Sequence, residues 1–269
     1  MVRKRSDKVL VVEIDANGTD VCQRRLPDEL VVEEPMTIQL DGHVVATTMR
    51  TPGNDYELAV GFCHGDGLLG GVPVTGVRYC ANGSAMASEF NVVTVETMGR
   101  APVPTSRLGT TSSSCGSCGT ENIEELVHRV RTLPADRLAN IDPAVVVGIP
   151  SRVLGDQTLF TSTGAVHAAA VFDADGLVSM IREDVGRHNA VDKVVGALLL
   201  EKRLPAHEFG LFVSGRASFE MVQKAWAAGF GTVVSVSAPT SLAVRTAHRA
   251  GITLYGFARD RRMVRYAPN

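Results

Sequence analysis

Two cysteines in the middle of the chain have the type and spacing that suit sulfur chemistry. Cys115 and Cys118 form a Cys-x-x-Cys pair just before a helix predicted to begin near Thr120. A helix N-terminus has partial positive charge, which stabilises a thiolate and lowers the pKa of the thiol. Because this effect fades within one turn, Cys118 should feel it more than Cys115. Thiolate is the nucleophilic form of cysteine, so the pair predicts sulfur or thiol transfer.

Three plainer interpretations of the pair stay open. A structural zinc site needs about four ligands, and without a second Cys-x-x-Cys it would have to recruit Cys63, His64 and Cys80 from a separate domain. A thioredoxin-like dithiol expects a strand before the motif, whereas a Thr/Ser run precedes it here. Incidental free cysteines are usually buried, whereas these two lie in the most polar segment of the chain.

Two other stretches suit an anion. The run Phe257-Ala258-Arg259-Asp260-Arg261-Arg262 follows a predicted strand, and its guanidinium groups suit bidentate contact with phosphate oxygens. Ser214-Gly215-Arg216 stands where a predicted strand ends and a helix begins, a position whose free backbone amides favour anions. The plain alternatives are a solvated charged tail for the first stretch and a simple tight turn for the second.

A dense polar cluster crosses another predicted strand-to-helix junction. It consists of Asp184, Arg187, His188 and Asp192. Helix capping and ion pairing alone would explain several of these residues. The functional alternative is a shell around a bound ligand and the sulfur handled by the cysteine pair.

His167 stands in a segment, 165–172, that we predict to be helical. Zinc deaminases place a catalytic Glu two residues after a zinc-binding His and need a downstream Pro-Cys-x-x-Cys. Here the second residue is Ala169, and the Cys-x-x-Cys lies upstream. Deaminase chemistry is therefore not expected, and His167 is predicted to be packed or hydrogen-bonded.

Composition excludes several classes of protein. With 269 residues and 45% hydrophobic content, the chain can build one large or two modest domains. A net charge of -2 gives no global basic field for nucleic acid or membranes, and 5% aromatics offer few stacking platforms. Five scattered cysteines suit a reducing compartment better than a disulfide framework. Neither a signal peptide nor a membrane span is evident, and the basic start, 1–5, is predicted to be a disordered tail.

The first hundred residues read mostly as strand. A hairpin turn is predicted at Asp41-Gly42, and a helix across Tyr56–Cys63. Together they suggest a small α+β domain with a largely antiparallel sheet. Residues 98–119 are rich in Gly, Pro and Ser and are predicted to be a mobile connection. The expected strands are 9–14, 30–40, 43–50, 72–79 and 90–97.

From Thr120 onward, predicted strands and helices alternate. This pattern favours a sheet with helices on both faces, which binds ligands beyond the carboxyl ends of its strands. The expected strands are 158–162, 177–182, 209–213, 232–236 and 252–257, and the expected helices are 123–130, 165–172, 189–202, 219–228 and 241–250.

Several motifs, taken in order, give the chain a resemblance to the FdhD/NarQ family of formate dehydrogenase accessory sulfurtransferases. The resemblance covers nearly the whole chain from about residue 30, and the EDVGRHNA run is its most specific part. The motifs are EPMTI at 34–38, ELAVGF at 57–62, SCGSCG at 114–119, FTSTGAVHAA at 160–169, REDVGRHNAVDK at 182–193, SGR at 214–216 and GFAR at 256–259.

The resemblance implies a fold and a quaternary structure. The fold is a cytidine-deaminase-like three-layer α/β/α domain preceded by a smaller α+β domain, usually in a homodimer. The expected divisions are a tail and leading strand at 1–29, the small α+β domain at 30–110, a mobile Cys-x-x-Cys segment at 111–119 and the large domain at 120–269.

The resemblance also implies a reaction in the cytoplasm. Cys115 would accept sulfur from a cysteine desulfurase as a persulfide and pass it to molybdenum in the bis(molybdopterin guanine dinucleotide) cofactor, which formate dehydrogenase then receives. Cys118 would assist release or protect the sulfur as a disulfide. Residues 257–262 would bind the guanine dinucleotide portion, which GDP would mimic. The cofactor is cargo, and neither a tightly bound metal nor a nucleic-acid or membrane partner is expected. A non-catalytic cofactor chaperone and a thiol-disulfide oxidoreductase are the alternatives.

Overall fold

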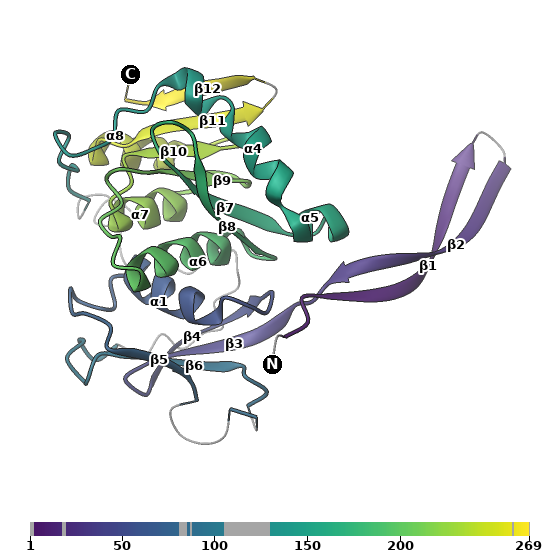
Figure 1. The fold of residues 1–269 in the computed structure, drawn as a ribbon, viewed down its shortest axis with the longest axis horizontal. Coiled ribbons are helices and arrows are strands. Elements are labelled where there is room, and N and C mark those ends of the chain that lie inside the picture. The colour runs from purple at the N-terminus through teal and green to yellow at the C-terminus, as the bar shows by residue number, and fades with distance from the viewer. Residues whose placement is uncertain are drawn as a thin grey trace.

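The computed structural model describes residues 3–17, 20–80, 85–86, 88–104, 130–259 and 261–268. Their strands form three sheets, of six, four and two strands (Figure 1). The predicted Cys-x-x-Cys segment, most of the predicted connection at 98–119 and the predicted helix at 123–130, apart from its last residue, lie outside these ranges. In the first part of that connection, Arg100 Nε donates to Thr97 O at 2.9 Å.

The six-stranded sheet has the order β12-β11-β10-β9-β7-β8. β9, β10 and β11 are parallel, while β7 is antiparallel to both of its neighbours and β12 is antiparallel to β11. The carboxyl ends of β8, β9, β10 and β11 therefore meet the start of β7 at one edge, which we call the carboxyl edge. The bounds are β7 His167–Phe172, β8 Val178–Asp184, β9 Gly210–Val213, β10 Thr232–Ser235, β11 Thr253–Arg259 and β12 Arg262–Ala267.

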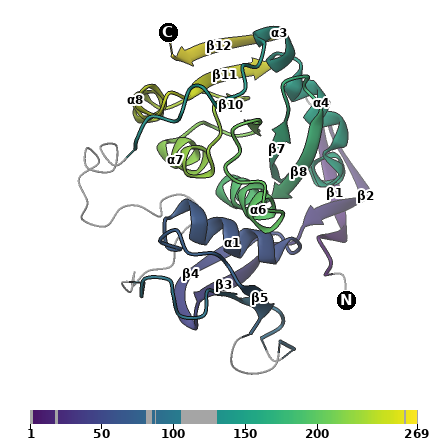
Figure 2. The same ribbon diagram turned by 60° about the vertical axis from the view of Figure 1, so that its left-hand side comes forward.

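Helices cover both faces of this sheet, as the alternating pattern predicts (Figure 2). On one face, Ala169, Val171 and Leu211 pack with α6 (Arg187–Leu200), α7 (Phe219–Ala228) and α8 (Ser241–Ala250). On the other, Ala170 and Phe212 pack with α3 (Pro143–Val146) and α4 (Ile149–Asp156). The large unit thus has three layers, while the deaminase-like detail of its topology stays a prediction.

The four-stranded sheet has the order β4-β3-β6-β5 and packs one face on α1 (Asp55–Gly65). The predicted hairpin is confirmed at Asp41 and Gly42, both of which have positive φ. α1 also packs against α6 (Figure 1). Because α6 lies between α1 and the large sheet, it is buried all round from Asn189 to Leu198. The bounds are β3 Glu34–Leu40, β4 His43–Arg50, β5 Gly76–Tyr79 and β6 Val92–Glu96.

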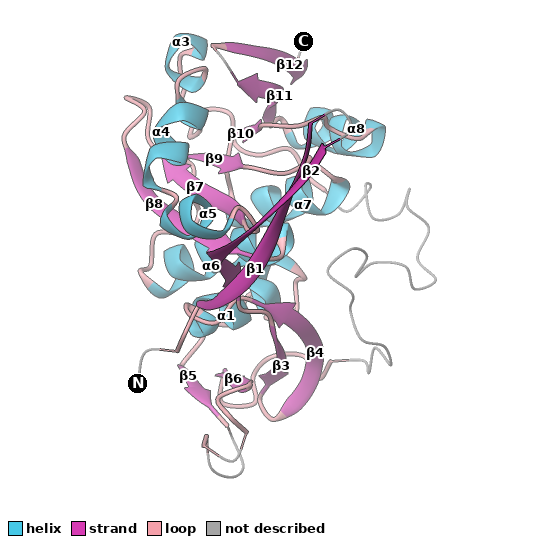
Figure 3. Cartoon of the chain, turned by 90° about the vertical axis from the view of Figure 1, so that its right-hand side faces the viewer, coloured by secondary structure: helices cyan, strands magenta, loops and turns pink. Residues whose placement is uncertain are grey.

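The third sheet is a two-stranded hairpin, β1 (Ser6–Asn17) and β2 (Asp20–Val31), which projects away from the rest of the chain (Figure 1) and lies in front of it in Figure 3. We call it the arm. The single strand predicted at 30–40 is wrong, because β2 ends before β3 begins. The predicted disordered start is also wrong for Arg3 and Arg5, which bond to Asn91 Oδ1 at 2.8 Å and Glu183 O at 3.3 Å.

In two adjacent segments of the large unit, the helix and the strand are the reverse of the prediction. The strand predicted at 158–162 is the helix α5 (Thr158–Thr163), and Gly164 ends it in the left-handed region with a φ of 64°. The helix predicted at 165–172 is wrong because residues 167–172 form β7, which lies between β9 and β8, so His167 begins a strand. Alanines favour helices, but tertiary packing overrides this preference where both faces of a strand are covered.

Candidate functional site

The loops after β9, β10 and β11 meet at the carboxyl edge. Ser235 Oγ donates to Gly215 O at 2.7 Å, or to Ser237 O at 3.0 Å. Phe257 N donates in turn to Ser237 O at 3.2 Å. The structure therefore brings the two predicted anion-binding stretches to one edge and links them through the end of β10. Sequence reasoning missed Ser235 and Ser237, whose signal would have been their place at the carboxyl end of the strand predicted at 232–236.

Ser214 connects this edge to the start of β7. Its hydroxyl accepts from Ala168 N at 2.9 Å and lies 3.3 Å from His167 Nδ1. Burial lowers the pKa of His167, and the charges of Arg187 and His188 lower it further. A neutral imidazole is therefore favoured here.

Gly215 lets two side chains approach the loop closely. A Cβ at this position would lie 3.2 Å from Arg187 Cδ and 3.5 Å from His167 Cε1. Arg187, at the start of α6, therefore lies against the loop that follows β9. Arg216, the next residue in that loop, is exposed.

The first turns of α6 and α7 are joined by one strong contact. His188 Nε2 lies 2.6 Å from Glu220 Oε2, and this hydrogen bond is the main cause of the lowered pKa of Glu220. Neither helix has a side-chain cap, whereas Thr240 Oγ1 caps α8 by accepting from Ala243 N. Sequence reasoning missed Glu220, although it stands in the first turn after the SGR loop.

Three buried polar atoms near these helix starts lack hydrogen-bond partners among the described residues. They are Arg187 Nε, His188 Nδ1 and Ser218 Oγ. Buried polar groups are normally satisfied, so each such atom needs an explanation. Uncapped N–H groups and a guanidinium favour negative charge, and this arrangement suits an oxyanion such as phosphate.

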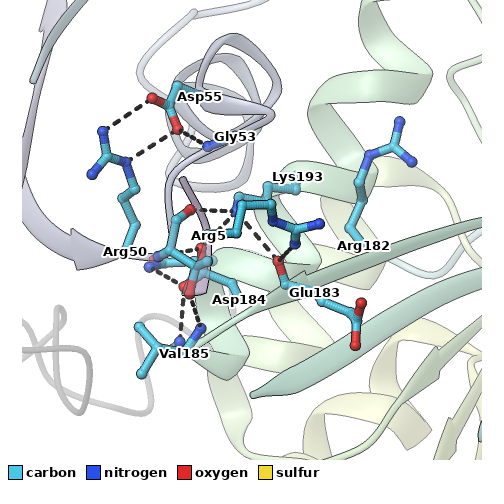
Figure 4. Close-up of polar contacts among 12 residues, drawn as sticks. Arg5, Arg50, Gly53, Asp55, Arg182, Glu183, Asp184, Val185 and Lys193 are labelled. Carbon is cyan, nitrogen blue, oxygen red and sulfur yellow. Dashed lines mark hydrogen bonds and ion pairs between the residues drawn. The ribbon is translucent and has the colours of Figure 1, made fainter. Parts of the chain in front are cut away.

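The other two residues of the predicted polar cluster have structural contacts. Asp184 is fully buried and pairs with Lys193 Nζ at 2.7 Å. It also accepts from Thr51 N and Gly186 N, at 3.2 and 2.8 Å. Figure 4 shows this network beside the buried pair of Arg50 with Asp55. Asp184 therefore ties β8 to the chain that leads into α1.

Asp192 stands on α6, where this helix packs against α7 and α1. Its carboxylate pairs with Lys224 Nζ at 2.7 Å, and Lys224 lies 3.6 Å from Asp66 Oδ1. Burial raises the pKa of Asp192 to about 6, although Lys224 opposes the shift. The predicted cluster thus divides, with Arg187 and His188 at the carboxyl edge and the two aspartates within the helix packing.

The C-terminal arginine run lies in a hairpin and not in a free tail, and its role in binding a ligand stays a prediction. Arg259 pairs with Arg262 across the turn from β11 to β12. Phe257 is 42% exposed and has a φ of 52°, while Ala258 is fully buried. Arg259, Arg261 and Arg262 are exposed, so their guanidinium groups are accessible to a ligand, and Asp260 lies outside the described residues.

Cys115 and Cys118 also lie outside the described residues. Cys63 is buried in α1, and burial raises the pKa of its thiol. Cys80 Sγ contacts Ser88 Oγ at 3.0 Å. Within the described ranges, no three His, Cys, Asp or Glu side chains gather to hold a metal ion, and no helix is long and apolar enough to cross a membrane.

Comparison with known proteins identifies relatives along most of the chain. Residues 31–269 match the FdhD/NarQ family. The sulfur carrier protein FdhD of Mycolicibacterium paratuberculosis is 46% identical over 239 residues, covering 87% of this chain and 88% of the relative. That of Corynebacterium efficiens is 41% identical over 266 residues, covering 96% and 95%. A crystal structure of a proposed formate dehydrogenase accessory protein from Desulfotalea psychrophila has the same fold, with a TM-score of 0.70, 22% identity and coverage of 97% and 96%.

Proposed function

The chain belongs to the FdhD/NarQ family, and from this premise we propose that it is a sulfur carrier that serves formate dehydrogenase. The observation that supports the proposal most is the meeting of the SGR and FAR stretches at one edge, through Ser235 and Ser237. A chain with a net charge of -2 needs such a local site to hold an anionic cargo.

Cys115 is the proposed sulfur carrier. Its thiolate attacks the outer sulfur of a persulfide on a cysteine desulfurase, a new S–S bond forms, and the donor cysteine leaves as a thiolate. Cys118 then assists release of the sulfur: its thiolate attacks Cys115 Sγ of the persulfide, the bond to the outer sulfur breaks, that sulfur leaves as hydrosulfide, and a Cys115–Cys118 disulfide forms. The chain acts as a sulfurtransferase in this scheme, and the persulfide is its covalent intermediate.

The proposed recipient is molybdenum in bis(molybdopterin guanine dinucleotide), bound as cargo before formate dehydrogenase receives it. Two places at the carboxyl edge suit its pyrophosphates. One is formed by Arg187, Ser218 and the exposed Arg216 at the starts of α6 and α7. The other is the hairpin formed by residues 257–262, where three arginines offer guanidinium groups. A cytoplasmic location and a homodimer are part of the same proposal.

Mass spectrometry tests the carrier. After incubation with a cysteine desulfurase and cysteine, the intact protein should gain one sulfur atom, and Cys115→Ala should abolish the gain. Cys63→Ala is the matched control, because that thiol is buried in α1. An adduct that persists unchanged in Cys115→Ala would reject the assignment.

A cofactor chaperone that handles no sulfur is the second candidate, because Ser214, Arg187 and the β11–β12 hairpin offer an anion site that needs no thiol chemistry. Complementation separates the two functions. A strain lacking the protein should recover formate dehydrogenase activity with the wild-type chain and not with Cys115→Ala/Cys118→Ala. Full recovery with the double variant would favour the chaperone. A thiol-disulfide oxidoreductase would instead reduce insulin and bind no guanine nucleotide.

A further inference from the structure

His188 and Glu220 join the starts of two packed helices at the carboxyl edge, and we call them the dyad. α6 packs against α7 (Figure 2), and His188 Nε2 lies 2.6 Å from Glu220 Oε2. Only 13 and 21% of the two side chains is exposed. The hydrogen bond to His188 is the main cause of the lowered pKa of Glu220, so this carboxyl is ionised. Glu220 therefore accepts the Nε2–H proton and holds the ring in one orientation.

The second nitrogen of the His188 ring, Nδ1, is buried and has no hydrogen-bond partner among the described residues. The same holds for Arg187 Nε, in the residue before it, and for Ser218 Oγ, two residues before Glu220. A buried polar atom without a partner costs free energy, so each needs an explanation. The three atoms stand at the helix starts where an anionic cargo is proposed to bind, and a ligand there would give His188 Nδ1 a partner.

The other imidazole at this edge, that of His167, has different surroundings. Burial lowers the pKa of His167, and the charges of Arg187 and His188 lower it further. Its Nδ1 lies beside the hydroxyl of Ser214, whereas His188 has the carboxylate of Glu220 within hydrogen-bond distance. A neighbouring carboxylate stabilises the charged form of an imidazole. Of the two rings, His188 is therefore the better proton donor.

Release of sulfur from a persulfide requires a proton. When the Cys118 thiolate attacks Cys115 Sγ, a disulfide forms and the electron pair of the broken S–S bond stays with the outer sulfur. Without a proton that sulfur would leave as a sulfide dianion, which is a poor leaving group because its conjugate acid is very weak. With one proton it leaves as hydrosulfide. A positioned acid accelerates such a step by about a hundredfold to ten-thousandfold.

We propose that His188 is the catalytic acid of sulfur release and that Glu220 is its positioning residue. The charged ring donates its Nδ1 proton to the outer sulfur as the S–S bond breaks, so hydrosulfide leaves beside the cargo and the ring becomes neutral. Glu220 holds the Nε2–H throughout, and a proton from solvent restores the charged ring. This inference rests on the proposed sulfur-carrier function and adds the residue that supplies the proton.

Charged groups from the elements that pack on α6 surround the dyad. The carboxylates of Asp184 and Asp192 each have a buried lysine at 2.7 Å. Because the pKa of Asp192 is about 6, a pH test must compare variants and not rely on the wild-type curve alone. The surrounding groups are Arg187 and Asp192 of α6, Lys224 of α7, His167 of β7, Asp184 of β8 and, just after α1, Asp66.

Sulfide release from the loaded protein tests the proton donor. The full chain is loaded by a cysteine desulfurase and cysteine, freed from both, and the sulfide that it releases is trapped with monobromobimane over time. His188→Gln keeps a hydrogen-bond donor toward Glu220 but has no acidic proton, so release should slow about a hundredfold or more while loading is unchanged. His248→Gln, at an exposed position in α8, is the matched control and should release sulfide at the wild-type rate.

Cyanide removes the same sulfur without a proton. It attacks the outer sulfur directly, thiocyanate forms, and Cys115 leaves as a thiolate. The wild type and His188→Gln should therefore react with cyanide at the same rate, which checks that both hold an equally reactive persulfide. Sulfide release that is as fast in His188→Gln as in the wild type would overturn the proposal. Equal slowing of both reactions would assign His188 a structural role and overturn it as well.

Glu220→Gln tests the positioning residue. Because the acid must be protonated, release should fall as the pH rises through its titration. Loss of the carboxylate destabilises the charged ring, so this fall should move about one pH unit lower in Glu220→Gln. It should disappear in His188→Gln. A fall at the same pH in Glu220→Gln, or one that persists in His188→Gln, would contradict the assignment to the dyad.

Failure of this inference and failure of the proposed function give different results. A chain that takes no sulfur on Cys115 would overturn the sulfur carrier, and the proton donor with it. A loaded wild type that keeps its sulfur would overturn the release step. A chain that loads at Cys115 and releases sulfide equally fast with and without His188 would overturn the proton donor alone.

Discussion

Gly61 of α1 and Gly196 of α6 lie backbone to backbone where the two helices cross. A Cβ on Gly61 would stand 1.8 Å from Asp192 O, and one on Gly196 would stand 1.8 Å from Glu57 O. No side chain fits at either position unless the helices separate. This contact holds the small sheet and its helix against the large unit.

We expect Gly196→Ala to destabilise the protein by about 1–3 kcal/mol, because the added methyl group forces the two helices apart. The measurement is the free energy of unfolding in urea. Gly155→Ala in α4 is the control, since a Cβ there meets nothing within 4 Å. That change should be neutral or stabilise by up to about 1 kcal/mol. Equal effects at the two glycines would refute the close approach.

The buried pair of Lys193 and Asp184 gives a second prediction. Both side chains are fully buried, and Lys193 also donates to Thr51 O at 3.0 Å. Lys193→Met should cost about 3–5 kcal/mol, because an uncompensated carboxylate stays in the interior. Arg78→Met, which breaks the exposed pair with Glu96, should cost less than about 1 kcal/mol. Similar losses in the two variants would contradict the buried network.

How far the sequence predicts this fold depends on where each element finds its contacts. The bounds of α7 and α8 are predicted correctly, because Gly229 and Gly251 end them with φ of 86° and 72°. β7 was missed because Ala168 to Ala170 favour a helix, and their burial between two layers is set by the surrounding elements. β2 was missed because it pairs only with β1, so its charged residues show no buried alternation.

The site shows the same division between local and distant causes. Ser214-Gly215-Arg216 could be located because a loop that joins a strand to a helix lies beyond the carboxyl end of that strand. The separation of Arg187 from Asp184 could not be predicted. It depends on Thr51, which is 133 residues from Asp184 in the chain and donates its N–H to that carboxylate.

Stability should depend on pH through Asp192. Its pKa is raised to about 6 by burial, while Lys224 lowers it and Asp66 raises it. Between about pH 4 and 6 the folded chain therefore binds a proton that the unfolded chain has lost, so the contribution of this carboxyl to stability is full below that window and is lost as the pH rises through it.

Asp192→Asn removes that titration. The unfolding free energy of the wild type minus that of Asp192→Asn should fall as the pH rises from about 4 to about 6. Denaturant titrations at successive pH values measure it. Asp136→Asn, at an exposed position, is the control and should show a smaller trend. A difference that rises with pH would mean that the ion pair with Lys224 outweighs burial.

Nucleotide binding distinguishes the two anion positions at the carboxyl edge. GDP has the pyrophosphate and guanine of the proposed cargo, and its affinity can be measured by calorimetry without active formate dehydrogenase. Removing a charged hydrogen-bonding group costs about 1.5–3 kcal/mol. Arg187→Ala and Arg259→Ala should therefore each weaken binding about tenfold or more. Arg203→Ala, beyond the far end of α6, is the control. It should leave the affinity for GDP within about twofold, since it removes only a distant, screened charge.

If only Arg259→Ala weakens GDP binding, the nucleotide lies along the β11–β12 hairpin, and the starts of α6 and α7 bind another part of the cargo. If neither variant weakens it, the carboxyl edge is not the cofactor site.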